Sequence, residues 1–502
     1  MAILISSPGL VTTGTEGADD IRFITGGLTG NASVVNALAG NDTIFGTNVV
    51  VRSAANIGAA PEINAGGGAD SVNFDFSGST NSASDLVING GAGRDTITIS
   101  GGDGGAAVGQ VAGADGGDRI NILGTAVYSA IGGGAGLDTI ELSGTTTIAT
   151  GGTVGAGAGN DLISGSLATL TGAGVLGGGG SDTITINSIA GTGSFVNGDS
   201  TTNGGDADVI TVDAQGAATV VRGKGGADTI KINGTILGSA VVAGNAGGDV
   251  ITISSDALAD DIAIQGGQGG DSIFLDTLTA NGISANLIGG GGADTITFDA
   301  GVINLAQVST NGGAGVDSIT FSGDIADDTD LGVIEISNLG DSKLGAMDTW
   351  DLTGLNGAGE TATVDFAAGT ALALPSAAAL SATDAVAATN ATDALGFTTA
   401  VGQSGSVISG AMSFSGQASA SVATAATYAD AATRIGTDAS DAGKAVLFTA
   451  GTDEYLFVQG GAAGTDDDYI VKFNGTDGST ITGTTILLGS DGDPADEDDI
   501  DQ

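Results

Sequence analysis

The fold is decided by a stretch such as residues 289–298, Gly-Gly-Gly-Gly-Ala-Asp-Thr-Ile-Thr-Phe. This stretch is one copy of a unit, Gly-Gly-X-Gly-X-Asp-X-aliphatic, that recurs about once every 23 residues over the first two thirds of the chain. Self-similarity at such a period is the sequence signature of stacked repeats, so it is read before any other feature.

An aspartate marks the phase of each copy. Glycine stands two residues before it in every copy except one, where Asp206 precedes Asp208. Two residues after it stands isoleucine, or valine in the case of Val72, and the residue four after it is usually large and apolar. The aspartates are Asp19, Asp42, Asp70, Asp95, Asp118, Asp138, Asp161, Asp182, Asp208, Asp228, Asp249, Asp271, Asp294 and Asp317.

Apolar residues two apart, with Thr, Asn or Ser between them, are typical of a strand. Each unit therefore predicts a glycine turn, a short strand such as residues 95–99, a looser turn and a second, weaker strand. Stacked coils of this kind give an all-β, right-handed parallel β-solenoid with neighbouring strands about 4.8 Å apart. The stacking places the isoleucines in a column inside the fold and the aspartates in a single row.

The row of aspartates predicts a metal site. Carboxylates about 4.8 Å apart repel each other by roughly 3 to 4 kcal/mol per pair at an effective dielectric constant near 20. The chain has 11 Lys and Arg against 58 Asp and Glu, and only Arg94 and Lys224 fall in the repeat turns, so protein cations cannot neutralise the row. Ca²⁺ takes six to eight oxygens from carboxylates and carbonyls, which a glycine turn with one aspartate supplies. Glycine is needed there for positive φ and close backbone approach. The alternative is that the aspartates merely form turns.

Four copies carry a resemblance to a known family: residues 90–97, 133–140, 266–273 and 312–319. They resemble the calcium-binding nonapeptide of repeats-in-toxin (RTX) proteins. The resemblance covers about residues 14–325 and implies calcium between successive turns and export by a type I secretion system that reads a C-terminal signal. The family's tight array has a motif every nine residues and two calcium rows. This chain has one motif per coil, which predicts one row, and the turns at Asp42 and Asp208 depart most from the pattern.

Composition excludes several other functions. The formal net charge of −47 argues against binding to nucleic acid or to an anionic membrane surface. Cysteine and histidine are both absent, so the chain offers no disulfide frame, thiolate nucleophile, Ser-His-Asp triad or His/Cys zinc site. No run approaches the roughly 18 to 20 apolar residues of a membrane span. The 11 basic residues are dispersed, which disfavours an enzyme acting on acidic polysaccharide.

The repeat also predicts the domain organisation. Residues 1–330 are expected to form about 14 calcium-binding coils, with candidate contact loops at 48–61 and 188–203. Residues 331–356, which include the only tryptophan, are expected to cap the solenoid. Residues 357–440 are an Ala/Ser/Thr-rich connection with a possible short helix at 418–435. Residues 441–502 are expected to form a small β-rich domain, with strands at 445–448, 454–458 and 469–473, an acidic tail and a type I secretion signal.

These features predict a secreted, non-enzymatic structural protein at the cell surface. We expect it to fold on binding Ca²⁺ and to assemble with copies of itself into an S-layer or extracellular filament, with cell-surface polysaccharide as a further candidate partner. The alternative is a calcium-dependent adhesin or an ice-binding module, since Thr pairs such as Thr96 and Thr98 could form a flat face. The middle position of that face is interrupted by Phe45, Glu141, Lys231 and Phe274.

Overall fold

The structure is a computed structural model in which all described elements are strands. The described residues are 2–5, 11–23, 34–47, 62–76, 86–101, 107–123, 127–143, 147–200, 205–254, 261–276, 284–298, 307–321, 333–336, 348–351, 363–366, 405–408, 411–414, 445–450, 453–458, 469–474, 480–482 and 485–487. The fold class expected from the sequence, a parallel β-solenoid with about 23 residues per coil, is confirmed. The chain divides into two compact units, Met1–Asp249 and Val250–Gln502.

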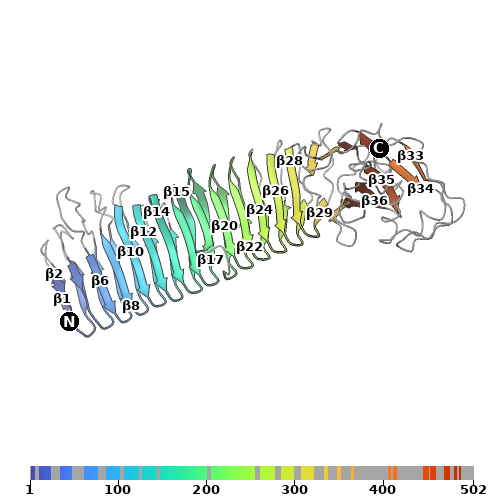
Figure 1. The fold of residues 1–502 in the computed structure, drawn as a ribbon. Coiled ribbons are helices and arrows are strands. Elements are labelled where there is room, and N and C mark those ends of the chain that lie inside the picture. Colours follow the sequence, from blue (N-terminus) through green and yellow to red (C-terminus); the bar gives the residue numbers. More distant parts are fainter. Residues whose placement is uncertain are drawn as a thin grey trace, which may run out of the picture. The chain divides into compact units, whose positions relative to one another are not determined.

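The solenoid has about 10 turns. In unit 1, each coil adds one strand to each of two parallel sheets (Figure 1). Sheet A begins with β1 (Ala2–Ile5) and then holds the strands that follow the repeat aspartates: β3 (Asp20–Phe23), β5 (Thr43–Gly46), β7 (Ser71–Asp75), β9 (Thr96–Ser100), β11 (Arg119–Leu123), β13 (Thr139–Ser143), β15 (Leu162–Thr171), β17 (Thr183–Ala190), β19 (Val209–Gln215) and β21 (Thr229–Ile232). Sheet B holds the strands that precede them: β2 (Val11–Thr13), β4 (Val34–Asn36), β6 (Glu62–Gly67), β8 (Val87–Ala92), β10 (Ala107–Asp115), β12 (Val127–Ala135), β14 (Thr147–Ala158), β16 (Gly174–Gly179), β18 (Phe195–Asp199), β20 (Val220–Gly225) and β22 (Val241–Ala246).

Unit 2 begins with coils of the same kind. Its sheet A strands are β23 (Val250–Ser254), β25 (Ser272–Asp276), β27 (Thr295–Phe298), β29 (Ser318–Phe321) and β31 (Asp348–Asp351), and its sheet B strands are β24 (Ile262–Gln268), β26 (Ser284–Gly291), β28 (Gln307–Ala314), β30 (Val333–Ile336) and β32 (Thr363–Phe366). Trp350 in β31 pairs in register with Ile319 in β29, so the backbone of the expected cap continues the column of repeat isoleucines.

The C-terminal strands of unit 2 are mainly antiparallel. They are β33 (Gly405–Ile408), β34 (Ala411–Phe414), β35 (Ala445–Ala450), β36 (Asp453–Val458), β37 (Tyr469–Asn474), β38 (Thr480–Thr482) and β39 (Thr485–Leu487). The three strands expected there are present as β35, β36 and β37, with β36 antiparallel to both of the others. The possible helix at 418–435 and the acidic tail lie outside the described residues.

The core consists of columns of apolar side chains stacked in register. Ile97 pairs with Val72 on one side and with Ile120 on the other, and all three are at most 1 % exposed. A facing column comes from sheet B, seven residues before most of the aspartates, and Ile88 and Val111 are two of its buried members. Full burial of one such side chain stabilises the fold by roughly 1.5 to 3 kcal/mol. The strand pattern that predicted sheet A is therefore confirmed, and the sheet B column is a second core row that the sequence showed only weakly.

Glycine is required in the turns because successive coils approach closely. Gly178 has a φ of +126°, and a Cβ on it would lie 1.8 Å from the carbonyl oxygen of Gly157 in the preceding coil. Gly180 has a φ of +108°, and its Cβ would lie 2.2 Å from the carbonyl oxygen of Gly159. No side chain fits at such distances, so glycine is required at Gly178 and Gly180. The requirement does not hold in every coil, because the position of Gly178 is taken by Leu38, Ala114, Lys224 and Asn245 in four others, with φ between 79° and 91°.

One expected loop is wrong in part. Residues 188–203 were predicted to be a lateral loop, but β17 continues to Ala190 and β18 covers Phe195–Asp199. The extra length of this coil, between the aspartates Asp182 and Asp208, therefore includes residues that follow Asp199 at the end of β18. The Ser and Gly content of this stretch is typical of a loop, and pairing with the neighbouring coils overrides that local preference. The other expected loop, 48–61, lies outside the described residues.

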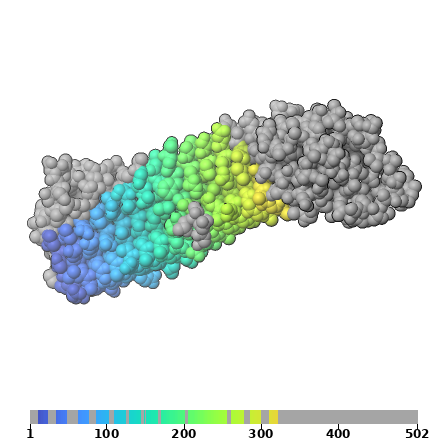
Figure 2. Space-filling view, viewed as in Figure 1, coloured from blue at the N-terminus to red at the C-terminus, as the bar shows by residue number. Residues whose placement is uncertain are grey.

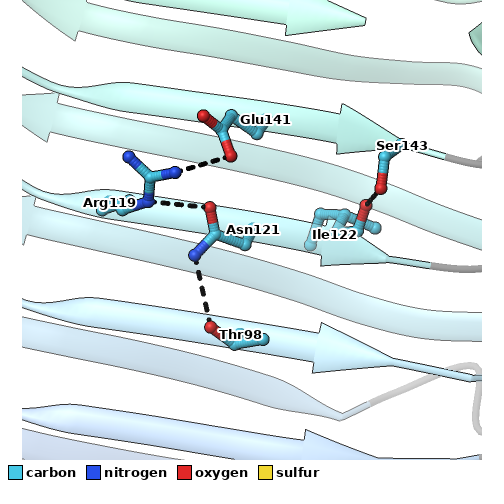
Figure 3. Close-up of polar contacts among 6 residues, drawn as sticks. All are labelled: Thr98, Arg119, Asn121, Ile122, Glu141 and Ser143. Carbon is cyan, nitrogen blue, oxygen red and sulfur yellow. Dashed lines mark hydrogen bonds and ion pairs between the residues drawn. The ribbon is translucent and has the colours of Figure 1, made fainter.

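The outer face of sheet A carries a polar row that runs across the coils (Figure 3). The Arg119 guanidinium contacts Glu141 in β13 at 2.8 Å and donates to Asn121 Oδ1 at 3.0 Å, and the Asn121 amide donates to Thr98 at 3.3 Å. Ser143 donates to the carbonyl oxygen of Ile122. Exposed ion pairs of this kind contribute about 0.2 to 1 kcal/mol. Charged groups thus interrupt the threonine row that an ice-binding face would need.

Candidate metal centre

The aspartate ladder is the set of repeat aspartates named above, and all of them are buried. Each is between 1 % and 4 % exposed. Each stands in the turn between a sheet B strand and a sheet A strand, as Asp95 does between β8 and β9. The coils of unit 1 follow one another across the surface as bands from blue to green (Figure 2), and the ladder side chains lie beneath that surface. Every residue of the predicted metal row therefore occupies the same position in its own coil.

One carboxyl oxygen of most ladder aspartates accepts a hydrogen bond from the backbone of the coil before it; the first, Asp19, is bonded by Thr15 instead. The amide N–H of Asp95, for example, donates to Oδ1 of Asp118 at 2.8 Å. The same bond, 2.7 to 2.9 Å long, links all successive ladder residues of unit 1 from Asp19 to Asp249, and in unit 2 it links Asp271 to Asp294 and Asp294 to Asp317. The expectation that only cations separate the carboxyl groups is thus incomplete, since an amide N–H lies between each pair.

The second carboxyl oxygen, Oδ2, is buried and has no hydrogen-bond partner among the described residues in most coils. This holds for Asp42, Asp70, Asp95, Asp118, Asp138, Asp161, Asp182, Asp208, Asp228 and Asp294. A buried acceptor without a partner costs about 1 to 3 kcal/mol, and more when it is charged. Nine such atoms in successive coils of unit 1, and one in unit 2, are therefore a strong indication that a proton or a cation belongs beside them.

In the coils whose unit begins with glycine, as at Gly90 and Gly289, Oδ2 lies near a backbone carbonyl oxygen of the next coil, whereas Ala37, Ala65 and Ala156 occupy that position in three other coils. A Cβ on Gly90 would lie 2.7 Å from Asp95 Oδ2 and 2.7 Å from the carbonyl oxygen of Gly113. On Gly289 the corresponding distances are 2.6 Å to Asp294 Oδ2 and 2.3 Å to the carbonyl oxygen of Gly312. The first glycine of the unit therefore leaves space into which one carboxyl oxygen and one carbonyl oxygen point. Oxygens of these two kinds are the ligands of a hard divalent cation.

Burial also changes the acidity of the ladder. Desolvation raises the pKa of Asp95 and Asp138 to about 6, of Asp182, Asp228 and Asp294 to about 7, and of Asp208 to about 8. The amide hydrogen bond from the preceding coil lowers each pKa, and neighbouring carboxylates raise it further. Without a metal, part of the ladder therefore carries protons near pH 7. The charge of the row can be neutralised by protons on Oδ2 or by cations.

The ladder does not form a metal cage from acidic side chains alone. Within the described ranges, no three His, Cys, Asp or Glu side chains converge in the manner of a metal site. A cation on the ladder would therefore depend on backbone carbonyl oxygens as well as on one or two carboxylates, a mixture that Ca²⁺ accepts and Mg²⁺, with its strict octahedral shell, accepts less readily. The residues present fit calcium in donor type. The alternative that the aspartates act as turn residues also holds in part, because Oδ1 accepts a hydrogen bond from the backbone N–H of the preceding coil and so helps to hold the turn in place.

One buried acid at this edge was missed in the sequence. Asp199 is 3 % exposed and pairs in register with Gly178, so it stands where other coils have the second glycine of the unit. Its only signal in the sequence was the irregular spacing before Asp208, which had been interpreted as a loop. The turns at Asp42 and Asp208, expected to be irregular, keep the ladder hydrogen bonds on both sides.

No protein-family model matches the sequence, and neither a curated protein nor a solved structure matches it at a significant level. In the part of the chain that the structure describes, no helix is long and apolar enough to cross a membrane.

Proposed function

We propose that this chain is a secreted structural protein of the cell surface whose solenoid folds when calcium binds along the aspartate ladder. The row of buried Oδ2 atoms without hydrogen-bond partners is the observation that carries the proposal. A protein that buries one acid per coil needs a counter-charge for each coil, and the two cations in the turns, Arg94 and Lys224, are too few.

The ligands for calcium would come from two neighbouring coils. Oδ2 of a ladder aspartate supplies the negative charge, and the carbonyl oxygens of the glycine turns supply the neutral donors, as Asp95 and Gly113 would. Bound calcium supplies positive charge that offsets the desolvation of the carboxylates. The hydrogen bond from the backbone N–H to Oδ1 fixes the orientation of the carboxyl group, so that Oδ2 points in the same direction from coil to coil.

Calcium binding would then be part of the folding free energy. Ladder sites join coils that are 20 to 28 residues apart in sequence, so they do not exist in the unfolded chain. A ligand that binds only the folded state stabilises it in proportion to the logarithm of its concentration. The chain would remain largely unfolded at low cytosolic calcium, leave the cell by a type I pathway and fold outside at millimolar calcium. A net charge of −47 increases the repulsion that calcium has to overcome.

Circular dichroism of the full chain tests the calcium requirement. With a chelator at about pH 8 we expect loss of most of the β signal, and recovery on addition of millimolar calcium. The double variant Asp95→Asn, Asp118→Asn should need more calcium for half-maximal folding, because two charged ligands are lost while the Oδ1 acceptors are kept. Asp213→Asn removes an exposed acid of β19 that is not part of the ladder and should leave the midpoint unchanged. A full β spectrum in chelator would refute the calcium requirement.

Assembly with further copies is the second part of the proposal. The absence of histidine and cysteine and the scarcity of basic groups leave little for catalysis, whereas a stack of nearly identical coils suits a protein made in bulk for a surface layer or filament. We expect sheets or filaments by negative-stain electron microscopy in millimolar calcium and dispersed particles in chelator. A protein that sediments as a monomer at high concentration in calcium would instead favour an adhesin, with cell-surface polysaccharide as the ligand to be tested.

A further inference from the structure

The coil that ends at Asp208 contains two buried carboxyl groups, where other coils of the ladder contain one. Asp199 is the last residue of β18 and is 3 % exposed, and the ladder residue Asp208 is 1 % exposed. In the neighbouring coil the residue paired with Asp199 is Gly178, which has no side chain. This coil therefore buries an additional acid that the repeat does not require.

Backbone N–H groups donate to the Asp199 carboxyl group but leave one of its oxygens without a hydrogen bond among the described residues. The amides of Gly225 and Asp206 donate hydrogen bonds to it, and its Oδ2 has no partner among the described residues. A Cβ on Gly205 would lie 1.5 Å from Asp199 Oδ2 and 2.3 Å from the carbonyl oxygen of Gly225. Both oxygens therefore lie close to the position that a Cβ of residue 205 would occupy. Because residue 205 is glycine, no side chain fills that position.

Asp208 provides a second incomplete oxygen nearby. Among the residues that the structure describes, its Oδ2 also has no hydrogen-bond partner, and a Cβ on Gly198 would lie 2.1 Å from it and 2.8 Å from the carbonyl oxygen of Gly223. Gly198 directly precedes Asp199 in the chain, and the charge of Asp199 acts on Asp208 and on the ladder residues on either side. Lys224 is the cation whose charge acts on Asp199. One lysine cannot neutralise this concentration of buried acids.

We propose that Asp199 and Asp208, with the carbonyl oxygens of Gly225 and Gly223, hold one calcium ion in a site outside the repeat that binds more tightly than the ladder positions. This coil has two buried carboxylates, whereas the other ladder coils have one. Affinity for Ca²⁺ increases with the number of charged ligands in a rigid site, so we expect tighter binding here. The proposal rests on the calcium binding proposed for the ladder and identifies the coil where that binding is strongest.

Calorimetric titration of the chelator-treated full chain with calcium alone tests the site. The wild-type protein should show one ion bound at least ten-fold more tightly than the rest. Asp199→Asn should abolish that class, because the amide keeps the shape and loses the charge, and Gly205→Ala should abolish it by placing a methyl group between the two oxygens. Asp115→Asn, which removes an exposed acid, should leave the affinity of the tight class within about two-fold.

The thermal stability of the chelated protein at about pH 5.5, where protons are expected to restore the metal-free fold, separates a ligand from a structural residue. Wherever it stays ionised, Asp199 adds repulsion when the metal is absent, so chelated Asp199→Asn should melt at the same temperature as the wild type or higher. A lower melting temperature, or a tight class that survives both Asp199→Asn and Gly205→Ala, would overturn the site and leave the ladder proposal standing. If the wild type is fully folded in chelator, calcium-dependent folding is refuted. If Asp199→Asn also loses the tightly bound ion, the site itself is supported. No calcium binding by the wild type would refute both.

Discussion

Replacing Gly178 with alanine should destabilise the solenoid by about 3 kcal/mol, whereas the same change at Gly179, the next residue, should be neutral or slightly stabilising. Gly178 has a φ of +126°, and a Cβ there would lie 1.8 Å from the carbonyl oxygen of Gly157. Left-handed backbone costs an L-residue about 1 to 2 kcal/mol, and the collision with a neighbouring backbone adds to this. Gly179 has nothing within 4 Å of its Cβ position. Alanine there only lowers the conformational entropy of the unfolded chain, which stabilises the protein by about 0.4 to 1 kcal/mol.

Urea unfolding in millimolar calcium, followed by circular dichroism, measures both substitutions. Hydrogen exchange of the coils near Gly178 shows whether the damage is local, as expected where each coil contacts only its neighbours. The reverse substitution Ala114→Gly is the matched control at the equivalent position, because Ala114 has a φ of 85°, and it should stabilise the protein by about 1 kcal/mol. Equal effects at Gly178 and Gly179 would contradict the close approach of the coils.

In the absence of metal, lowering the pH from about 8 to about 5.5 should restore much of the fold. Burial raises the pKa of Asp138 to about 6 and that of Asp208 to about 8, against an ordinary value of 3.8. The folded state therefore holds protons that the unfolded chain has released. Stability from these groups is complete below about pH 4 and is lost as the pH rises through 6 to 8. Calcium should reverse this trend, because protons and calcium compete for the same Oδ2 atoms.

The pH dependence is measured as the urea midpoint in chelator across this range. The double variant Asp138→Asn, Asp208→Asn should show a smaller dependence on pH and a higher midpoint at about pH 8, since its side chains carry no charge to neutralise. Exposed acids also repel each other less at low pH, and Asp115→Asn accounts for that contribution. A midpoint that rises with pH in chelator would contradict the buried, raised-pKa ladder.

The repeat determined much of the fold and of the candidate site. Ile97 and its equivalents are buried as the spacing predicted, and every ladder aspartate lies at the predicted point of its coil. This succeeded because the information is local: a strand alternates its side chains with a period of two, so a few residues decide which of them point inward. The need for glycine in the turns followed from the same short motif.

The role of each carboxyl oxygen was decided only by the tertiary structure. Asp95 donates its amide to Asp118, which is 23 residues away in sequence, and no local pattern indicates which oxygen accepts that bond and which remains without a partner. Asp199 shows the same limit. In the sequence it belongs to an irregular loop, and only its pairing with Gly178 in the neighbouring coil makes it a buried acid at the metal edge. Period and composition thus determine which residues face inward, whereas contacts between coils decide which buried charges need a partner, because those contacts exist only once the coils have stacked.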